Sequence, residues 1–405
     1  MSRIIQYDYQ PGHLANSEPG KWNPSELSEG ETILNLGPQH PSTHGVLRLE
    51  IRLDGELVNA CEPHIGYLHR CFEKHAEALP FNQIIPYVDR MDYLGSMNSE
   101  HVYAMALEKW LGISSEIHPR VEYIRMLVCE LNRIASHFVA IGTYGIDLGA
   151  ITPFLWLMRD REHILRMLEW ASGARMLYNY IWVGGLFYDL PIGFEEKVRE
   201  FVVYLGPKLK ELEDLLLNNE IFVARTANIG VIPRALAVNA GLTGPMLRAS
   251  GIRKDLRKEK GYSLYESVEF DVPVGFGQRG TCGDCWDRTW VRVAECRESL
   301  KIILQCLDRL QSDCKRTPEF NPQAACPKKI RPKEGAYFFT GETPRGELSF
   351  FMTADGRSDI PLRLKARTPS FSHLSILSDI SKGILLADLI AIVGSLDLVM
   401  GEVDR

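Results

Sequence analysis

Apolar and polar residues alternate along Val46–Leu53, a pattern typical of a strand with one buried face. A shorter apolar segment, Thr32–Leu36, precedes it, so residues 31–36 and 46–60 predict an antiparallel hairpin. The Asp-Gly pair within Leu53–Glu56 is a turn signal and leads to a further short strand. We therefore expect a small β layer over residues 31–62.

Helical spacing replaces this alternation in the middle of the chain. Apolar residues recur every three or four positions, with few internal Pro or Gly, over 98–111, 119–141, 154–182, 194–218 and 287–314. A shorter helix is expected from Arg70 to Leu79. Together these segments predict a helix bundle over residues 63–320.

The segment 119–141 shows the two faces of such a helix. We expect one face to be buried, and it carries Ile124, Leu127, Val128, Leu131, Ile134, Ala135 and Phe138. The opposite face carries Glu122, Arg125 and Arg133, and His137 lies at the border, where a hydrogen-bonded structural histidine is the simpler interpretation. A Gly-rich break over 142–150 follows, in which Asp147 has apolar neighbours and needs a partner, for which a histidine would serve.

The last third of the chain returns to alternation and then becomes apolar. Residues 335–368 predict a second β layer, and residues 369–405 predict a buried C-terminal segment, apolar from Leu385 to Met400. The basic run Arg253–Lys260 is most simply a solvated face. The pattern thus predicts a mainly α protein with small β layers (α+β), as a single domain over 31–405 behind an extended arm over 1–30.

Composition narrows the class of protein. A net charge of -6 argues against a nucleic-acid partner, and no stretch approaches the ~20 apolar residues that cross a bilayer. The start of the chain lacks the layout of a signal peptide, so export is not expected. Of nine cysteines, only Cys282 and Cys285 have metal-ligand spacing, and one such pair supplies half the ligands of a usual site. A disulfide framework and a metal there are both disfavoured.

Two histidines lie in the turn between the first strands, Gly37–Gly45. Pro38 and Pro41 stiffen this loop, so His40 and His44 would be held in place rather than mobile. Imidazole exchanges protons near neutral pH and binds metals. The loop alone leaves open a proton-handling site, a metal site and a plain surface turn.

Long motifs across the chain resemble one family, the quinone-site (49 kDa, NuoD) subunit of respiratory complex I. In order, these are GPQHPSTHGVLRL from Gly37, HIGYLHR from His64, RMDYL from Arg90, ELNRIASH from Glu130, DLGAITPF from Asp147, GLTGPMLRASG from Gly241, RESLKII from Arg297, RGELSF from Arg345 and the terminal MGEVDR. So many motifs in one order are far more specific than any single one.

The resemblance implies a fold like that of the large subunit of nickel–iron hydrogenases. Those relatives hold their metal with two CxxC pairs, and the matching positions here are Asp92 and Gly95, and Val399 and Glu402. Without sulfur ligands the hydrogenase reaction is excluded, because a nickel–iron centre needs thiolates. The resemblance implies that a quinone headgroup occupies the remaining cavity.

The resemblance also implies roles for individual residues. His44 and Tyr93 would bind the quinone carbonyls and supply protons, with Asp147 as the partner of His44. Met91 and Val399 would line the quinone site. Other residues match positions near the iron–sulfur cluster of a neighbouring subunit or in supporting roles: Arg70 and His137 near the cluster, Arg90 and Asp92 bracing Tyr93, and His40 orienting its loop. For Arg70, a surface ion pair with Glu73 or Glu77 is the alternative.

In that family the chain binds no cofactor or metal of its own and works with NuoB-type, NuoC-type, NuoI-type and membrane NuoH-type subunits. It would be peripheral, on the cytoplasmic side of the inner membrane, in a proton-translocating NADH:quinone oxidoreductase. Alternatives are a metal-free hydrogenase-fold scaffold without a role in quinone chemistry and, less favoured, a soluble metal enzyme using His40 and His44. The sequence departs from the family at Leu177, where relatives commonly have a histidine, and in a longer segment over 275–282.

Overall fold

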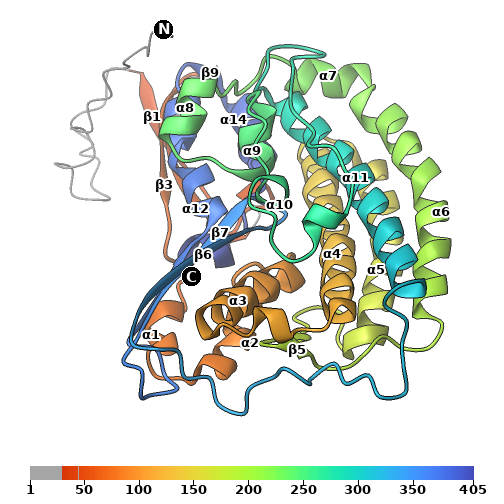
Figure 1. Ribbon diagram of the computed structural model, residues 1–405. Helices are drawn as coiled ribbons and strands as arrows, with labels where there is room; N and C mark the ends of the chain where they lie inside the picture. Colours follow the sequence, from red (N-terminus) through yellow and green to blue (C-terminus); the bar gives the residue numbers. More distant parts are fainter. Residues whose placement is uncertain (1–29, 44) are drawn as a thin grey trace, which may run out of the picture.

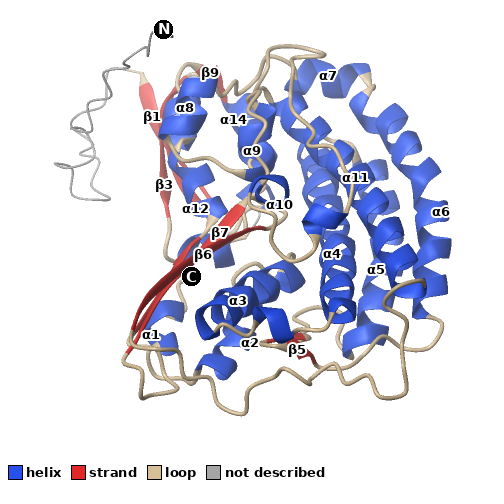
Figure 2. Ribbon diagram, in the orientation of Figure 1, coloured by secondary structure: helices blue, strands red, loops and turns tan. Residues whose placement is uncertain are grey.

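The computed structural model describes residues 30–43 and 45–405 and shows long helices packed beside two small sheets (Figure 1). These two sheets lie to one side of the long helices, and the C-terminus lies on that side, next to one of the sheets. Figure 2 shows the same division by secondary structure, which confirms the expected α+β class. The expected arm before residue 30 and His44 lie outside the described residues.

The first sheet confirms the predicted hairpin and adds a strand to it. Its order is β1 (Glu31–Leu36), β2 (Arg48–Asp54), β3 (Leu57–His64) and β9 (Ile384–Leu385), with antiparallel pairing throughout. Along β2, Leu49, Ile51 and Leu53 are buried and alternate with more exposed polar residues, as the pattern predicted. The short β9 comes from the far end of the chain and had no signal in the sequence.

The second sheet is the predicted C-terminal β layer. It contains β6 (Gly335–Glu342), β7 (Glu347–Ala354) and β8 (Arg363–Arg367) in that order. The tight turn between β6 and β7 holds Arg345, which is 1% exposed. A third, two-stranded sheet pairs β4 (Ile181–Trp182) with β5 (Gly185–Leu186).

The helices form the bulk of the molecule, and α4 and α11 pack against each other at its centre (Figure 1). The α-helices of the bundle are α1 (Phe72–Ala76), α2 (Ile85–Asp89), α3 (Ser96–Leu111), α4 (Pro119–Asp147), α5 (Ile151–Ser172), α6 (Phe194–Leu212), α7 (Glu220–Thr226), α8 (Arg234–Asn239), α9 (Gly244–Ala249), α10 (Leu256–Glu259) and α11 (Cys285–Gln311). The C-terminal helices are α12 (Pro369–Ser375), α13 (Leu377–Ile380), α14 (Leu386–Ser395) and α15 (Met400–Asp404). Among the described residues, no helix combines the length and apolarity that a membrane span requires.

The expected Gly-rich break after residue 141 is wrong, because α4 continues to Asp147. Gly142 and Gly145 serve close packing instead of ending the helix. A Cβ at Gly142 would lie 3.2 Å from Cδ2 of Phe154, and one at Gly145 would lie 3.1 Å from the carbonyl oxygen of Ala150. Asp147 is therefore the last residue of the helix and does not lie in a loop.

The predicted helix over 154–182 is too long at its C-terminal end. Helix α5 stops at Ser172, where Gly173 adopts φ 84°, the left-handed conformation typical of a residue that ends a helix. Residues beyond it form a turn and then β4, with Leu177 and Asn179 also at positive φ. The apolar residues of 176–182 fit helical spacing, but their backbone forms an irregular segment followed by the strand β4.

Two surfaces that the sequence indicated as polar are buried. Arg125 and Arg133, on the polar face of α4, are fully buried, and so is Arg257 in the basic run that we expected to be solvated. Their guanidinium groups meet buried carboxylates, which no local pattern reveals. The apolar C-terminal segment, in contrast, is buried as predicted, with Leu389, Ile392 and Val393 in α14 in the core.

Candidate functional site

The C-terminal segment brings together the elements that carry the predicted site residues. Glycines permit these approaches. A Cβ at Gly401 would lie 2.8 Å from the carbonyl oxygen of Met91, and one at Gly394 would lie 2.8 Å from Oδ2 of Asp147. A Cβ at Gly45 would lie 3.3 Å from Cγ of Met400. Gly45 and the Tyr93 turn thus pack against α15, and the end of α4 packs against α14.

The loop before β2 is ordered by contacts with His40. The N–H of Ser42 donates to Nδ1 of His40 at 3.2 Å, and the hydroxyl of Thr43 donates to the His40 carbonyl at 2.7 Å. His40 therefore organises its own loop, in agreement with the role expected for it. His44 itself lies outside the described residues.

Tyr93 lies on the turn between α2 and α3, and a buried ion-pair cluster fixes this turn. Nη1 of Arg345 lies 2.8 Å from both carboxylate oxygens of Asp92, and Nη2 lies 3.2 Å from Oδ1 of Asp397. Asp92 also accepts the N–H of Gly95 at 3.1 Å. We call Asp92, Arg345, Asp397 and Glu402 the brace, and it supports the expectation that Asp92 holds Tyr93.

The Tyr93 phenol is half-buried and remains protonated at neutral pH. Burial raises its pKa, the positive charge of Arg345 opposes this increase, and the negative charge of Asp92 adds to it. Its hydroxyl group makes no hydrogen bond to any described residue. The backbone around it, in contrast, is held by hydrogen bonds from the N–H groups of Leu94 and Gly95 to Asp92 and from the Ser96 hydroxyl to the Tyr93 carbonyl. The phenol is thus a fixed donor without an acceptor in the described part of the chain.

Glu402 lies at the end of the chain beside the brace and behaves as a neutral acid. It is 2% exposed, forms no ion pair with a described residue, and accepts one short hydrogen bond, from the hydroxyl of Ser370 at 2.6 Å. Burial and the nearby charge of Asp92 raise the pKa of Glu402 to about 8, against the attraction of Arg345. The brace therefore holds a protonated carboxyl group at neutral pH.

The remaining predicted quinone contacts are buried within the chain. Met91 is 1% exposed and Val399 is 2% exposed. Both flank Gly401 in the packing of the Tyr93 turn against α15, because Met91 contacts Gly401 and Val399 immediately precedes α15. Both residues are therefore buried where the Tyr93 turn packs against α15, whereas Tyr93 itself is partly exposed.

Arg70 does not form the surface ion pair that we considered as the alternative. Glu73 and Glu77 both pair with Arg363, at 2.8 Å each. Nη2 of Arg70 instead donates to the carbonyl of Arg90 at 2.5 Å and lies 3.5 Å from that of Gly401. The exposed Arg70 thus keeps a positive charge beside the Tyr93 turn that no described carboxylate pairs.

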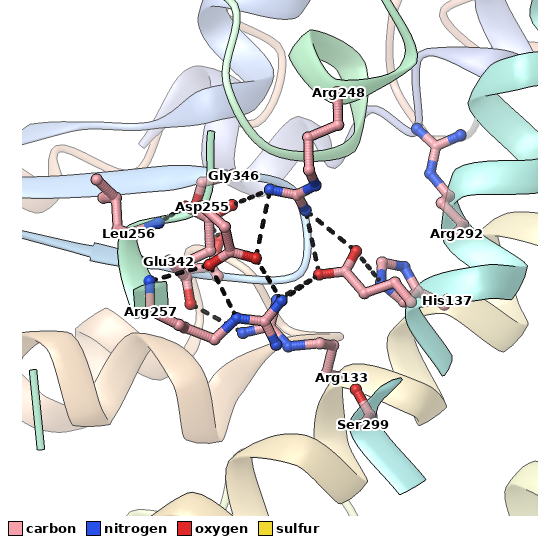
Figure 3. A network of polar contacts seen from close by, with 12 residues as sticks. Arg133, His137, Arg248, Asp255, Leu256, Arg257, Arg292, Ser299, Glu342 and Gly346 are labelled. Carbon is pink, nitrogen blue, oxygen red and sulfur yellow. Dashed lines mark hydrogen bonds and ion pairs between the residues drawn. The ribbon is translucent and has the colours of Figure 1, made fainter. Parts of the chain in front are cut away.

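His137 is fully buried in a second charged cluster, which we call the inner array: Arg133, Arg248, Arg257, Glu130, Asp255, Glu295 and Glu342 (Figure 3). Nε2 of His137 lies 3.1 Å from Oε2 of Glu295, which also accepts from Arg248 and, through Oε1, from Arg257. Although burial opposes ionisation, Arg248, His137 and Arg257 hold the pKa of Glu295 well below its usual range. The structural interpretation of His137 fits these contacts, and proximity to a partner's cluster stays a prediction.

The sequence analysis missed Arg345, Asp397 and Glu295. Arg345 sits in a Pro-Arg-Gly turn between strands, and Asp397 is a charged residue inside an otherwise apolar segment. A lone charge in an apolar run signals a buried partner, as we argued for Asp147 but not for Asp397. Nothing local marks Glu295, because its partners come from helices far apart in sequence.

The Cys282 and Cys285 pair does not form a joint site. The Cys282 thiol lies 3.3 Å from the carbonyl of Gly275, whereas Cys285 is buried with its sulfur 2.9 Å from Nη2 of Arg288. Within residues 30–43 and 45–405, no three His, Cys, Asp or Glu side chains are grouped so as to hold a metal ion.

Comparisons with known proteins identify the class of protein first. The chain is 64% identical over 392 residues to a D subunit of the NADH-quinone oxidoreductase of Cytophaga hutchinsonii, covering 97% of this chain and 100% of that protein. It is 61% identical over 405 residues to the corresponding protein of Amoebophilus asiaticus, covering both chains fully, and 57% identical over 380 residues to that of Chlorobium phaeovibrioides, covering 94% of each. The chain is therefore a subunit of a respiratory NADH:quinone oxidoreductase, complex I, and its partners are other subunits of that complex.

The family model narrows this class. The model described as "Respiratory-chain NADH dehydrogenase, 49 Kd subunit" matches residues 147–405. The chain belongs to the family of this 49 kDa subunit, as the motifs indicated.

Proposed function

We propose that this chain forms the quinone site of complex I together with a neighbouring iron–sulfur subunit. A quinone headgroup would bind between the Tyr93 turn and the loop that carries His44, and would be reduced there to quinol. The observation that carries the proposal is the Tyr93 phenol, which is fixed by the brace and has no acceptor among the described residues.

The chemistry assigned to this chain is proton donation. Reduction of a quinone to quinol takes two electrons and two protons. Because burial keeps Tyr93 protonated, its O–H donates a hydrogen bond to one carbonyl oxygen and passes the proton as negative charge develops there. We assign the second donor to His44, whose imidazolium is an acid near neutral pH.

Asp147 is the proposed partner of His44. A carboxylate beside an imidazole favours the charged ring, so it would keep His44 ready to donate. The contact of Asp147 with Gly394 fixes the end of α4 against the C-terminal segment, on which the other site elements also pack. Once His44 has given up its proton, Asp147 no longer faces a positive charge and can change partners, which is the step we propose as the start of proton pumping.

The electrons would come from an iron–sulfur cluster in the NuoB-type neighbour, with Arg70 and His137 on that side. The exposed Arg70, bonded to backbone carbonyls, is a fixed positive charge and would raise the potential of a cluster placed beside it. Met91 and Val399 would form the wall under the headgroup. NuoC-type, NuoI-type and membrane NuoH-type subunits would complete the surroundings and hold the chain at the cytoplasmic side of the inner membrane.

Tyr93→Phe in the assembled complex tests the proposal. This change removes only the hydroxyl group, so we expect assembly and NADH oxidation by an acceptor that takes electrons upstream to persist, while quinone reduction falls by about 10²-fold or more. Tyr188→Phe, at a tyrosine that is 59% exposed, is the control and should be unchanged. Unaltered turnover with a short-tailed quinone in Tyr93→Phe would instead favour the metal-free scaffold.

A further inference from the structure

Two buried acids, Asp89 and Glu100, flank the Tyr93 turn, one on each side. Asp89 is the last residue of α2, and Glu100 lies in the second turn of α3. Both side chains are fully buried, and neither forms an ion pair with a described residue. Unpaired buried carboxylates are costly, so the remaining contacts of these acids decide their charge.

The contacts join both acids to residues 179–181, the segment that leads into β4. Oδ2 of Asp89 accepts the N–H of Asn179 at 3.0 Å, and Oε2 of Glu100 accepts those of Tyr180 and Ile181 at 2.9 and 2.7 Å. Oδ1 of Asp89 and Oε1 of Glu100 are buried and accept from no donor in the described part of the chain, and each carboxyl group influences the ionisation of the other, so the two can satisfy these oxygens by sharing a proton. A hydrogen bond between two carboxyl groups requires a proton on one of them.

The segment 177–181 that they hold, which leads into β4, is strained. Leu177 has φ 60° and Asn179 has φ 45°, in the left-handed region that a leucine rarely adopts. Such a backbone persists only where its surroundings fix it. Three consecutive N–H groups of this segment, those of residues 179, 180 and 181, are fixed by the two acids.

Glu108 shows what a buried glutamate on the same helix does when it has a cation. It lies two turns further along α3, is 2% exposed, and likewise accepts a backbone N–H of the hairpin, that of Gly184, at 2.7 Å. Its carboxylate is held by both Nη atoms of Arg125, at 2.6 and 3.1 Å. Burial raises the pKa of Glu108, and the charge and hydrogen bonds of Arg125 oppose this rise, whereas Glu100 has no such cation among the described residues.

We propose that Asp89 and Glu100 share one proton and act as positioning residues that fix the Tyr93 turn against the 177–181 segment, and that loss of this proton at alkaline pH loosens the turn. This proposal rests on the proposed role of Tyr93. The pair anchors both ends of the turn to one strand, so its repulsion, once both acids are ionised, would move α2 and α3 apart.

The charges around the pair agree with this assignment. Burial raises the pKa of Asp89 to about 6, and burial together with the charge of Asp89 raises that of Glu100 well above its usual value, so the pair holds a proton more readily than two separate carboxylates would. The groups that face the pair are Arg90 after α2, Tyr178 and Tyr180 from the strand and Cys129 from α4. Burial raises the pKa values of both tyrosines and of the thiol, so these neighbours stay neutral at neutral pH.

Linkage between ionisation and folding gives the direction in which stability changes with pH. Because the pKa values of the pair are raised in the folded state, the stability that it contributes falls as pH rises through those values. A glutamine at 100 reproduces the protonated acid permanently: its oxygen accepts the strand N–H groups and its amide donates to Asp89. An alanine reproduces neither function.

The experiment compares the assembled complex carrying Glu100→Gln, Glu100→Ala or Glu108→Gln, by quinone reductase activity and thermal inactivation from about pH 6 to about pH 10. We expect Glu100→Gln to keep most of the activity at neutral pH and to lack the alkaline decline of the wild type. Glu100→Ala should lose about tenfold or more in activity at all pH values, and Glu108→Gln should lower stability at all pH values, because Arg125 loses one of its two carboxylates. Asp89→Asn is the second variant and should also flatten the alkaline decline.

The proposal is overturned if Glu100→Gln declines with pH as the wild type does, or if Glu100→Gln assembles no better than Glu100→Ala. An unchanged alkaline decline in Glu100→Gln, with Tyr93→Phe still inactive, would remove the shared proton and leave the proposed function in place. An active Tyr93→Phe would remove the proposed function, whatever the pH profile of Glu100→Gln.

Discussion

The brace and the inner array are built from the same residue types. They differ in whether each buried carboxyl group is paired with a cation. In the inner array, Glu295 contacts His137, Arg248 and Arg257, so its carboxylate is fixed as an anion. In the brace, the carboxyl group of Glu402 accepts from the Ser370 hydroxyl alone among the described side chains, and it keeps a proton up to about pH 8. The supply of arginines thus decides whether a buried acid is a permanent structural charge or a group that can exchange a proton.

The position of the two clusters matches this difference. The inner array is closed within α4, α9, α10, α11 and β6, as Figure 3 shows for its central contacts. The brace lies directly under the Tyr93 turn and joins it to the C-terminal segment. Arg292, on α11, also approaches the brace, with Nε 3.7 Å from Oδ2 of Asp397. We therefore expect changes in the array to act on stability and changes in the brace to act on activity.

Among the variants that test this contrast, we expect Glu295→Ala to have the largest effect. It removes a carboxylate from three buried guanidinium groups, those of Arg133, Arg248 and Arg257, and removal of one partner from a buried ion pair costs about 3–5 kcal/mol. We expect little of the variant chain to enter the complex, measured as subunit content after purification. Asp313→Ala, which removes an exposed ion pair with Arg309, is the control and should cost less than ~1 kcal/mol. Normal assembly of Glu295→Ala would show that the array is not the structural element inferred here.

Arg345→Lys is the next test, on the brace. A lysine keeps the charge but cannot bridge Asp92 and Asp397, because an ammonium group lacks the planar fork of a guanidinium. The Tyr93 turn would shift, and a displacement of this kind costs about 10²-fold in rate. We expect the complex to assemble and quinone reduction to fall by this amount.

The matched control for Arg345→Lys is Arg363→Lys. Arg363 also bridges two acids, Glu73 and Glu77, but it is a surface residue, so its replacement should change neither assembly nor turnover. If Arg345→Lys lowered assembly more than Glu295→Ala did, the division between a structural array and a site-holding brace would be wrong.

The periodic parts of the fold could be predicted from the sequence, and the buried charges could not. Strand β2 and helix α11 follow from local spacing, because one face of each is buried against the core. Local spacing fails for Arg257, because a basic run is polar in any local window. Only the approach of Glu130 and Asp255 makes its burial favourable. The strained turn at Leu177 has no local cause either, since its fixing acids come from α2 and α3.

The residues that support the candidate site could not be predicted from the sequence either. Tyr93 and Asp147 were placed by motif resemblance, and the structure adds what holds them: Arg345 for the Tyr93 turn and Gly394 for the end of α4. These supports are distant in sequence from the residues that they hold. A glycine or an arginine in a short turn carries no sign of its partner until the chain is folded.

Glu402→Gln gives the smallest and most specific effect. In the folded chain the pKa of Glu402 is raised from an ordinary value of 4.5 to about 8, so between these two values the unfolded chain ionises more readily than the folded one. Stability contributed at this position is therefore full below about pH 4.5 and is lost as pH rises to about 8. A glutamine has no proton to lose and can still accept the bond from Ser370, so the variant should escape this loss. We expect the apparent midpoint of thermal inactivation of the variant complex to exceed that of the wild type by an amount that grows from about pH 5 to about pH 8 and then stays constant. A gap that did not change over this interval would mean that Glu402 is already ionised at low pH, and the brace would then not differ from the inner array in the way that its contacts indicate.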